Sequence, residues 1–392
     1  MNGRRESDEM SDDYLPGLEN VIASETNISY LDVEKEEIVV RGYDLIELAQ
    51  HVTYLDIVGL LLDGALPNPE ERQSIEEKLR SEYGLPPNVN AILQLLPEQA
   101  DFMDVLRTGI SAIASYDVDL EDRSREANTR KAIRLLAKVP EIVANGYRAQ
   151  TKQPFIDPRK ELSYTANFLY MITGRVPTKM EEAIFDQSLI VYSEHEMPNS
   201  TFAARVIAST QSDLYGALTG AVASLKGTLH GGANEAVMAM LLEAGSEANL
   251  EALMLNKLAK KERIMGFGHR VYMKKADPRA LLMKEALAEL AIDKNQPELY
   301  NMCVLGEEVM KRDKNLHPNL DYYAAPVYYL LGIPIELFTP VFLAARTIGI
   351  SAHVIEQHDN NRLFRPRVHY KGPRDLHPPP QPSHLSRKDE YE

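Results

Sequence analysis

The chain has 392 residues, of which 44% are hydrophobic and 26% charged, and its formal net charge is −15. This composition is typical of a soluble protein long enough for more than one domain. The acidic balance argues against nucleic-acid and anionic-membrane partners, because both reward clustered Lys and Arg. The single cysteine, Cys303, excludes an internal disulfide framework and fits a reducing, cytoplasmic compartment.

Both ends of the chain are expected to be disordered tails. Residues 1–13 are polar and contain no apolar stretch of the kind found in a secretory signal. Residues 372–392 include a proline-rich run at 378–382, which offers little to bury. Inside these limits, the apolar stretches 28–33 and 37–40 flank a charged turn and predict a small β-hairpin.

From Leu45 onward the apolar residues follow helical spacing almost throughout. Leu45, Leu48, Ala49 and Val52 recur at three- and four-residue intervals. The Ala- and Gly-rich segment 209–226 predicts a helix that approaches a neighbour closely. Prolines expected to punctuate helices are Pro67, Pro97, Pro140, Pro177, Pro198, Pro326, Pro334 and Pro340. The predicted fold class is therefore all-α with one short N-terminal hairpin.

Residues 324–355 are the most apolar part of the chain. Pro334, Glu336, Pro340 and Arg346 interrupt them, so no clean apolar run of about 20 residues is left for a membrane span. We expect buried helices separated by prolines.

Several well-known catalytic motifs are incomplete. Residues 195–199 begin like the zinc motif HExxH but lack its second histidine, and Pro198 would disrupt the helix. Residues 266–268 lack the third glycine of a dinucleotide fingerprint, and 226–228 reverse the glycine and lysine of a P-loop. No GxSxG sequence occurs. Metal hydrolysis, dinucleotide binding and serine hydrolysis are poorly supported, and no metal site is predicted.

Three residues suit acid–base chemistry. His230 and His269 each stand beside glycine, which lets backbone and ligand approach closely. Asp321 precedes an apolar stretch whose partial desolvation would raise the proton affinity of its carboxylate. Arg346 lies in an apolar segment and needs an anion, supplied by the protein or by a ligand. These residues predict an α-rich enzyme that transfers protons and binds carboxylates, without naming the reaction.

A basic cluster near the end of the ordered chain, Arg362, Arg365 and Arg367, has two open interpretations. It is either a solvated face or an anion site, and spacing does not decide between them. Six further histidines are interpreted as structural: His51, His353, His358, His369, His377 and His384.

The chain resembles the citrate synthase family at these same residues. The segments that carry the resemblance include Leu229-His230-Gly231-Gly232, Gly266-Phe267-Gly268-His269-Arg270 and Pro318-Asn319-Leu320-Asp321, together with residues 41–44, 192–196, 277–279, 345–347 and 365–367. The match runs in order from about residue 16 to 372. Within the family it is most similar to the 2-methylcitrate synthases of Bacillus-type bacteria.

The resemblance implies a homodimer whose active site is completed across subunits. It implies a large domain of residues 14–230 and 336–371 and a small domain of residues 231–335 that closes over the substrates. It also implies condensation of propionyl-CoA, and of acetyl-CoA, with oxaloacetate and water to give 2-methylcitrate or citrate and CoA. The acyl-CoA is then a co-substrate, and no tightly bound cofactor is expected.

Two alternatives stay open. One is a citrate synthase of the tricarboxylic acid cycle, with acetyl-CoA as main substrate. The other, more remote, is a non-catalytic acyl-CoA-binding scaffold. Propionyl-CoA and acetyl-CoA differ by one methylene, which a hydrophobic pocket distinguishes by only about 1–3 kcal/mol.

The resemblance also implies individual roles. Asp321 removes the proton next to the thioester carbonyl, His230 hydrogen-bonds that carbonyl oxygen, and His269 polarises the ketone of oxaloacetate. The implied oxaloacetate ligands are His195, Arg279, Arg346 and, from the partner subunit, Arg365. The implied CoA-binding residues are Ile264, Met265, Gly266, Phe267, Gly268, Lys274 and Lys314. The turn at 273–276 is one residue longer than in many members, which affects how Arg279 is placed.

Overall fold

The computed structural model describes residues 14–19, 21–32, 34–35, 37–268 and 276–379. Thr26–Leu363 form one compact unit, and the chain outside these limits forms a second. In the described part of the second unit, the only regular element is a 3₁₀ helix, η1, at Pro16–Leu18. Residues 372–379 contain no helix or strand, as expected for a tail, whereas 1–13 and 380–392 lie outside the described residues.

The predicted hairpin is confirmed. β1 (Ser29–Asp32) pairs antiparallel with β2 (Glu37–Val40), with Ser29 opposite Val40. A short third strand that the sequence did not indicate, β3 (Tyr43–Asp44), pairs with the end of β2. The carboxylate of Asp44 then accepts a hydrogen bond from the backbone N–H of Glu47 and so starts the first helix.

The all-α fold class is confirmed by sixteen α-helices in the described residues. They are α1 (Leu45–His51), α2 (Tyr54–Asp63), α3 (Pro69–Ser81), α4 (Pro87–Leu95), α5 (Phe102–Ala114), α6 (Arg125–Gln150), α7 (Tyr164–Thr173), α8 (Lys179–Ser193), α9 (Asn199–Ala208), α10 (Leu214–Leu225), α11 (Ala233–Ala244), α12 (Glu247–Ala259), α13 (Pro278–Asp293), α14 (Pro297–Lys314), α15 (Leu320–Leu330) and α16 (Phe338–Asp359). A second 3₁₀ helix, η2 (Ile335–Leu337), precedes α16.

Two of the prolines expected to punctuate helices lie inside them instead. Pro140 is within α6 and Pro326 within α15, and both are buried. An interior proline costs about 3 kcal/mol or more through a lost hydrogen bond and a steric clash. Here the apolar ring fills core space on the buried side of each helix, which offsets that cost. Pro340 also falls inside a helix, but in the first turn of α16, where the missing N–H has no intrahelical acceptor.

The predicted helix over 209–226 is shorter than expected. α10 begins at Leu214, because the carboxylate of Asp213 accepts the backbone N–H of Gly216 and caps the helix. The close approach is confirmed: a Cβ added to Gly220 would lie 2.1 Å from Cδ1 of Ile207 on α9.

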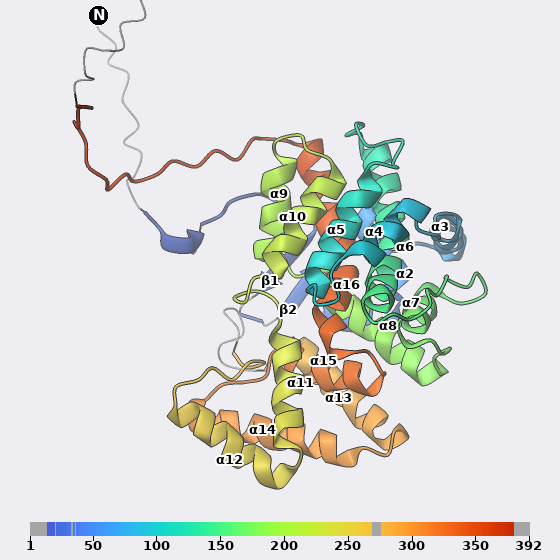
Figure 1. Ribbon diagram of the computed structural model, residues 1–392, viewed down its shortest axis with the longest axis vertical. Coiled ribbons are helices and arrows are strands. Elements are labelled where there is room, and N and C mark those ends of the chain that lie inside the picture. Colours follow the sequence, from blue (N-terminus) through green and yellow to red (C-terminus); the bar gives the residue numbers. More distant parts are fainter. Residues whose placement is uncertain (1–13, 20, 33, 36, 269–275, 380–392) are drawn as a thin grey trace, which may run out of the picture. The chain divides into compact units, whose positions relative to one another are not determined.

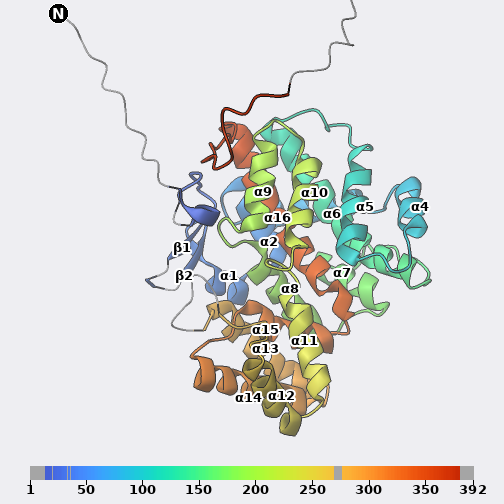
Figure 2. The ribbon, with the colours of Figure 1, turned by 60° about the vertical axis from the view of Figure 1, so that its left-hand side comes forward.

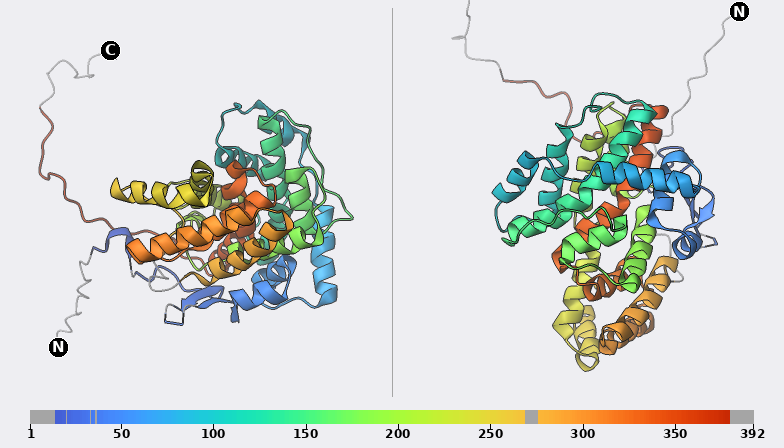
Figure 3. Two further views of the ribbon diagram at one scale, coloured as in Figure 1. Left: turned by 90° about the horizontal axis from the view of Figure 1, so that it is seen from below. Right: turned by 90° about the vertical axis from the view of Figure 1, so that its right-hand side faces the viewer.

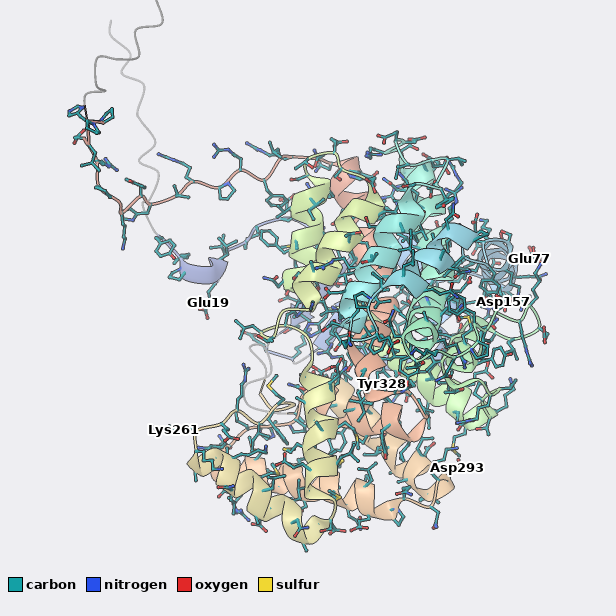
Figure 4. The ribbon with its side chains drawn as sticks, viewed as in Figure 1. Glu19, Glu77, Asp157, Lys261, Asp293 and Tyr328 are labelled. Atoms are coloured by element: carbon teal, nitrogen blue, oxygen red, sulfur yellow. The ribbon has the colours of Figure 1, made fainter. Side chains whose placement is uncertain are left out.

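α16 is the core helix of the large unit. It packs against α2, α6, α8, α9 and α10 and is surrounded by helices in Figure 3. The span Ile335–Asp359 is long and apolar enough to cross a membrane, yet 94% of its apolar window is buried inside the protein. Buried aromatic side chains such as Tyr328, labelled among the helices in Figure 4, fill the space beside it. The expectation of buried helices in this region is confirmed.

Helices α11 to α15 gather at one end of the same unit (Figures 1 and 2). Within this group α13 and α11 pack on α15, and α12 packs on α14. These helices lie within residues 231–335, the predicted small domain, but the division of Thr26–Leu363 into a large and a small domain stays a prediction. Movement of this part as a domain stays a prediction.

An ion-pair cluster around the buried carboxylate of Glu181 joins the start of α8 to the end of α13. Its Oε1 lies 2.6 Å from Lys294 Nζ and 2.6 Å from Arg175 Nη2, while Oε2 accepts the Thr178 N–H at 2.8 Å. Burial opposes ionisation of Glu181, but the hydrogen bonds from Arg175, Lys294 and Thr178 outweigh it and lower the pKa to about 2.

We therefore expect Glu181 to make stability depend on pH. Because its pKa is lower in the folded chain than in the unfolded chain, its contribution is fully present above about pH 5 and is lost as the pH falls towards 2. Glu181→Gln should remove about 2–3 kcal/mol of unfolding free energy near pH 7 and progressively less at lower pH. Urea unfolding between pH 3 and 7 measures this.

The matched control is Glu289→Gln, which changes an exposed carboxylate on α13 that makes no hydrogen bond or ion pair within the described part of the chain. It should leave the pH dependence of stability unchanged. Equal losses for Glu181→Gln at pH 3 and pH 7 would contradict the assignment.

Candidate active site

Asp321 lies in the first turn of α15 and is held there by hydrogen bonds. Its backbone N–H donates to Oδ1 of Asn319, the capping residue, at 3.1 Å. The hydroxyl of Tyr192, at the end of α8, donates to Asp321 Oδ1 at 2.7 Å. Burial raises the pKa of Asp321, while the Tyr192 hydrogen bond and the charge of Arg279 act in the opposite direction. The result is an ordered carboxylate with the raised proton affinity expected of a base.

Arg279 is oriented by its neighbour Asp277. Asp277 caps α13, and its Oδ1 accepts both the backbone N–H and the Nε–H of Arg279 at 3.0 Å. Oδ2 accepts Arg279 Nη2 at 2.7 Å and the N–H of Leu320 at 3.3 Å. The Asp277 carboxylate therefore ties Arg279 directly to the start of the helix that carries Asp321. The longer turn before Asp277 lies mostly outside the described residues, but Arg279 itself is firmly placed.

Arg346 projects from α16 and is only 3% exposed. Its Nε–H donates to the backbone oxygen of Tyr192, and its guanidinium lies 4.9 Å from the ring centroid of Phe342. Burial lowers the pKa of Arg346 to about 10, Glu194 opposes that change, and Arg279 adds to it. The side chain stays charged at neutral pH. Its terminal nitrogens make no hydrogen bond to a described residue, so they can receive the carboxylate of a ligand.

His230 sits in the turn between α10 and α11, facing the start of α9. Its Nε2 lies 3.2 Å from the backbone N of Ser200 and 2.8 Å from Ser200 Oγ. A backbone N–H can only donate, so Nε2 carries no proton and Nδ1 does. Burial and the charge of Arg346 lower the pKa of His230 to about 4. His230 is therefore a neutral imidazole with Nδ1–H as its donor.

The predicted CoA-binding segment is paired with the residues that lead into α15. Phe267 forms a β-bridge with Pro318, and the Asn319 N–H donates to Gly266 O at 2.9 Å. Gly266 has a positive φ of 86°, and a Cβ there would lie 2.6 Å from Val237 Cγ2. The Phe267 ring lies 4.3 Å from that of Tyr322. Residues 264–268 and Asp321 are thus parts of one packed unit.

The effect of one side chain's charge on the pKa of another shows which predicted site residues lie near each other. Arg279 and Arg346 both act on the pKa of Asp321, and Arg346 acts on that of His230. His195 follows α8 directly and is 9% exposed. The arrangement combines a carboxylate base, a neutral hydrogen-bond donor and two oriented guanidinium groups, which suits proton abstraction beside a carbonyl in an anionic substrate.

For four predicted residues the described structure does not test a place in this cluster. His269 and Lys274 lie outside the described residues. Arg365 belongs to the second unit, where it is exposed and its Nη1 lies 3.4 Å from Pro366 O. Lys314 ends α14 with an exposed side chain. Their roles stay predictions.

Sequence reasoning assigned no role to Tyr192, Ser200 or Asp277. Asp277 had a signal, because an acid directly before a proline is typical of a helix start and can hold the first turn. Tyr192 is 129 residues from its partner Asp321, and the hydrogen bond of Ser200 to His230 also joins distant segments. No spacing rule connects such pairs.

Comparison with known proteins agrees with this geometry. The family described as citrate synthase, C-terminal domain, matches residues 17–367. The citrate/2-methylcitrate synthase of Bacillus subtilis is 61% identical over 361 residues, covering 92% of this chain and 97% of that protein. A citrate synthase of Heyndrickxia coagulans is 59% identical over 363 residues, covering 93% and 97%.

A solved structure gives the same result for the fold. Citrate synthase from Thermoplasma acidophilum, in ternary complex with carboxymethyl coenzyme A and oxaloacetate, superposes with a TM-score of 0.87 at 32% identity, covering 93% of this chain and 97% of that one. With the family matched over most of its length and the fold shared, the chain is an enzyme of the citrate synthase family.

Proposed function

We propose that the enzyme condenses propionyl-CoA, and also acetyl-CoA, with oxaloacetate, and then hydrolyses the thioester to give 2-methylcitrate or citrate and free CoA. The observation that carries this proposal is that the charge of Arg346 acts both on Asp321, whose pKa burial raises and which Tyr192 hydrogen-bonds, and on His230, whose pKa burial lowers to about 4. One is a base and the other a neutral donor, which is the combination that enolisation of a thioester requires.

In the proposed mechanism Asp321 removes the α-proton of the acyl group. A carboxylate in water is far too weak a base for this step, so the oxygen that becomes negative must be stabilised at the same time. The Nδ1–H of neutral His230 serves that purpose without the full positive charge that would weaken the base. Positioned proton transfer contributes about 10²–10⁴-fold. The hydrogen bond from Tyr192 fixes which carboxylate oxygen of Asp321 is free to act.

The other substrate is proposed to bind as a dicarboxylate. Arg279 and Arg346 offer guanidinium forks, which match carboxylates through two parallel hydrogen bonds. We include His195 and, from a partner subunit, Arg365 among its ligands, and His269 as the group that polarises its ketone. The proposal further comprises a cytoplasmic homodimer with no tightly bound cofactor, and CoA contacts from residues 264–268, Lys274 and Lys314.

The alternatives are less favoured. The Bacillus subtilis relative is named for both products, which supports dual use over a citrate synthase restricted to acetyl-CoA. A non-catalytic scaffold would have no reason to keep Asp321 buried and hydrogen-bonded to Tyr192, or His230 neutral and hydrogen-bonded to Ser200.

Asp321→Asn tests the assigned base. The variant keeps the shape and an acceptor for Tyr192 but cannot take a proton, so kcat should fall at least about 10³-fold, while oxaloacetate binding measured by calorimetry survives. Asp293→Asn, at the exposed end of α13, is the matched control and should keep full activity. Turnover by Asp321→Asn close to that of the native enzyme would refute the role.

The acyl preference can be measured directly by comparing kcat/KM for the two thioesters. We expect both to react, with propionyl-CoA favoured, and the ratio to stay within about 200-fold, because one methylene decides it. A strong preference for acetyl-CoA would overturn the proposed preference for propionyl-CoA.

Tyr192→Phe should change the pH profile rather than the fold. The lost hydrogen bond is one of the influences that lower the pKa of Asp321, so that pKa rises further. Because the base works only when ionised, the acidic limb of kcat/KM should move to higher pH. Tyr164→Phe removes another buried hydroxyl, which donates to Leu136 O at 3.1 Å, and should leave the limb in place. A shift towards lower pH in Tyr192→Phe would contradict the explanation.

A further inference from the structure

The turn that carries His195 has a backbone conformation that needs support. It joins α8 to α9, and Glu196, the residue after His195, has a φ of 59°. This left-handed conformation is unfavourable for a residue with a Cβ, by roughly 1–2 kcal/mol. Contacts outside the turn must therefore stabilise it if His195 is to keep one orientation.

The hydroxyl of Ser29 in β1 forms hydrogen bonds with the residues on both sides of His195. It donates to Glu194 Oε1 at 2.8 Å and accepts the backbone N–H of Glu196 at 3.0 Å. One small side chain thus bridges the residues before and after His195. The strand itself is fixed to α16, since the Asn27 N–H donates to Glu356 Oε1 at 2.8 Å.

Glu194 is completely buried and receives a second hydrogen bond from α16. Its Oε1 lies 3.1 Å from His353 Nε2. Arg205 Nη1 lies 2.8 Å from the other ring nitrogen, Nδ1. A guanidinium can only donate, so Nδ1 is the acceptor and Nε2–H donates to Glu194. Burial opposes ionisation of Glu194, but His353, Arg346 and Ser29 together lower its pKa, so it is an ionised carboxylate.

α16 also touches the backbone of the same segment. A Cβ added to Gly349 would lie 2.3 Å from both Glu194 Oε2 and Ser193 O, so the helix and the turn are in direct contact. Arg346, one helical turn earlier, donates through Nε to Tyr192 O. Residues 192–196 are therefore bound by β1 on one side and by α16 on the other.

We propose that Ser29, Glu194 and His353 are positioning residues that set the orientation of His195 and Arg346 towards a dicarboxylate substrate. They act through the turn and not by touching the ligand. The inference rests on the proposed function, because it assumes that His195 and Arg346 bind oxaloacetate.

Ser29→Ala is the first test, because it removes the hydrogen bonds to Glu194 and Glu196 with little change in side-chain volume. We expect the Kd of the full-length enzyme for oxaloacetate, measured by calorimetry, to rise ~10-fold, as expected for a lost hydrogen bond to a charged group. The KM for acyl-CoA should stay within about twofold. The control Ser351→Ala removes a buried hydroxyl that, among the described residues, hydrogen-bonds only to Thr347 O of its own helix, and should leave both values unchanged.

Glu194→Gln is the second test, because it keeps an acceptor for Ser29 and His353 and removes only the charge. Oxaloacetate should bind no more weakly than to the native enzyme, since Arg346 then faces one negative charge fewer. The inference is overturned if Ser29→Ala lowers thermal stability but keeps native oxaloacetate affinity, or if Glu194→Gln weakens binding as much as Ser29→Ala. Absence of oxaloacetate binding by the native enzyme would refute the proposed function itself.

Discussion

The burial of Arg346 in the core of an all-helical protein is the constraint around which the rest of the site is arranged. A guanidinium cannot lose its charge at neutral pH, so its desolvation must be balanced by acceptors and carboxylates. The backbone of Tyr192, the carboxylate of Glu194 and the face of Phe342 supply that balance. Removing any of them would leave a buried positive charge poorly compensated until an anionic ligand binds, so α8, α16 and the turn after α8 are positioned together.

Most of the other residues of the candidate site lie in the first turn of a helix. Asp321 lies in the first turn of α15, Arg279 in that of α13, and Ser200 in that of α9, where it meets His230. The partial positive charge at an N-terminus stabilises an ionised Asp321 and disfavours a proton on His230. In α13 and α15 a capping side chain, Asp277 or Asn319, also fixes the first turn, so side chains there are held more firmly than on a loop.

Sequence reasoning succeeded where local rules govern the structure. Two apolar stretches on either side of a charged turn were enough to predict the hairpin, and helical spacing was enough to predict the fold class. It failed at Pro140 and Pro326, because core packing outweighs the local preference of proline. The residues His230, Asp321, Arg279 and Arg346 were predicted as site residues from glycine-marked turns, apolar surroundings and family resemblance, and their roles stay predictions. Their partners Tyr192, Ser200 and Ser29 were missed, because hydrogen bonds across the fold leave no periodic signal.

In the proposed mechanism, the charge arrangement explains how one site can contain both a base and cationic groups that bind the substrate. Arg279 and Arg346 lower the proton affinity of Asp321, whereas desolvation raises it. The effect of desolvation is the larger, so the pKa of Asp321 stays above its ordinary value. A dianionic substrate bound to the arginines would offset part of their charge. The proton affinity of Asp321 would then increase once oxaloacetate is in place. The base would be strongest when the second substrate is ready to react, which protects the acyl-CoA from enolisation in the absence of its partner.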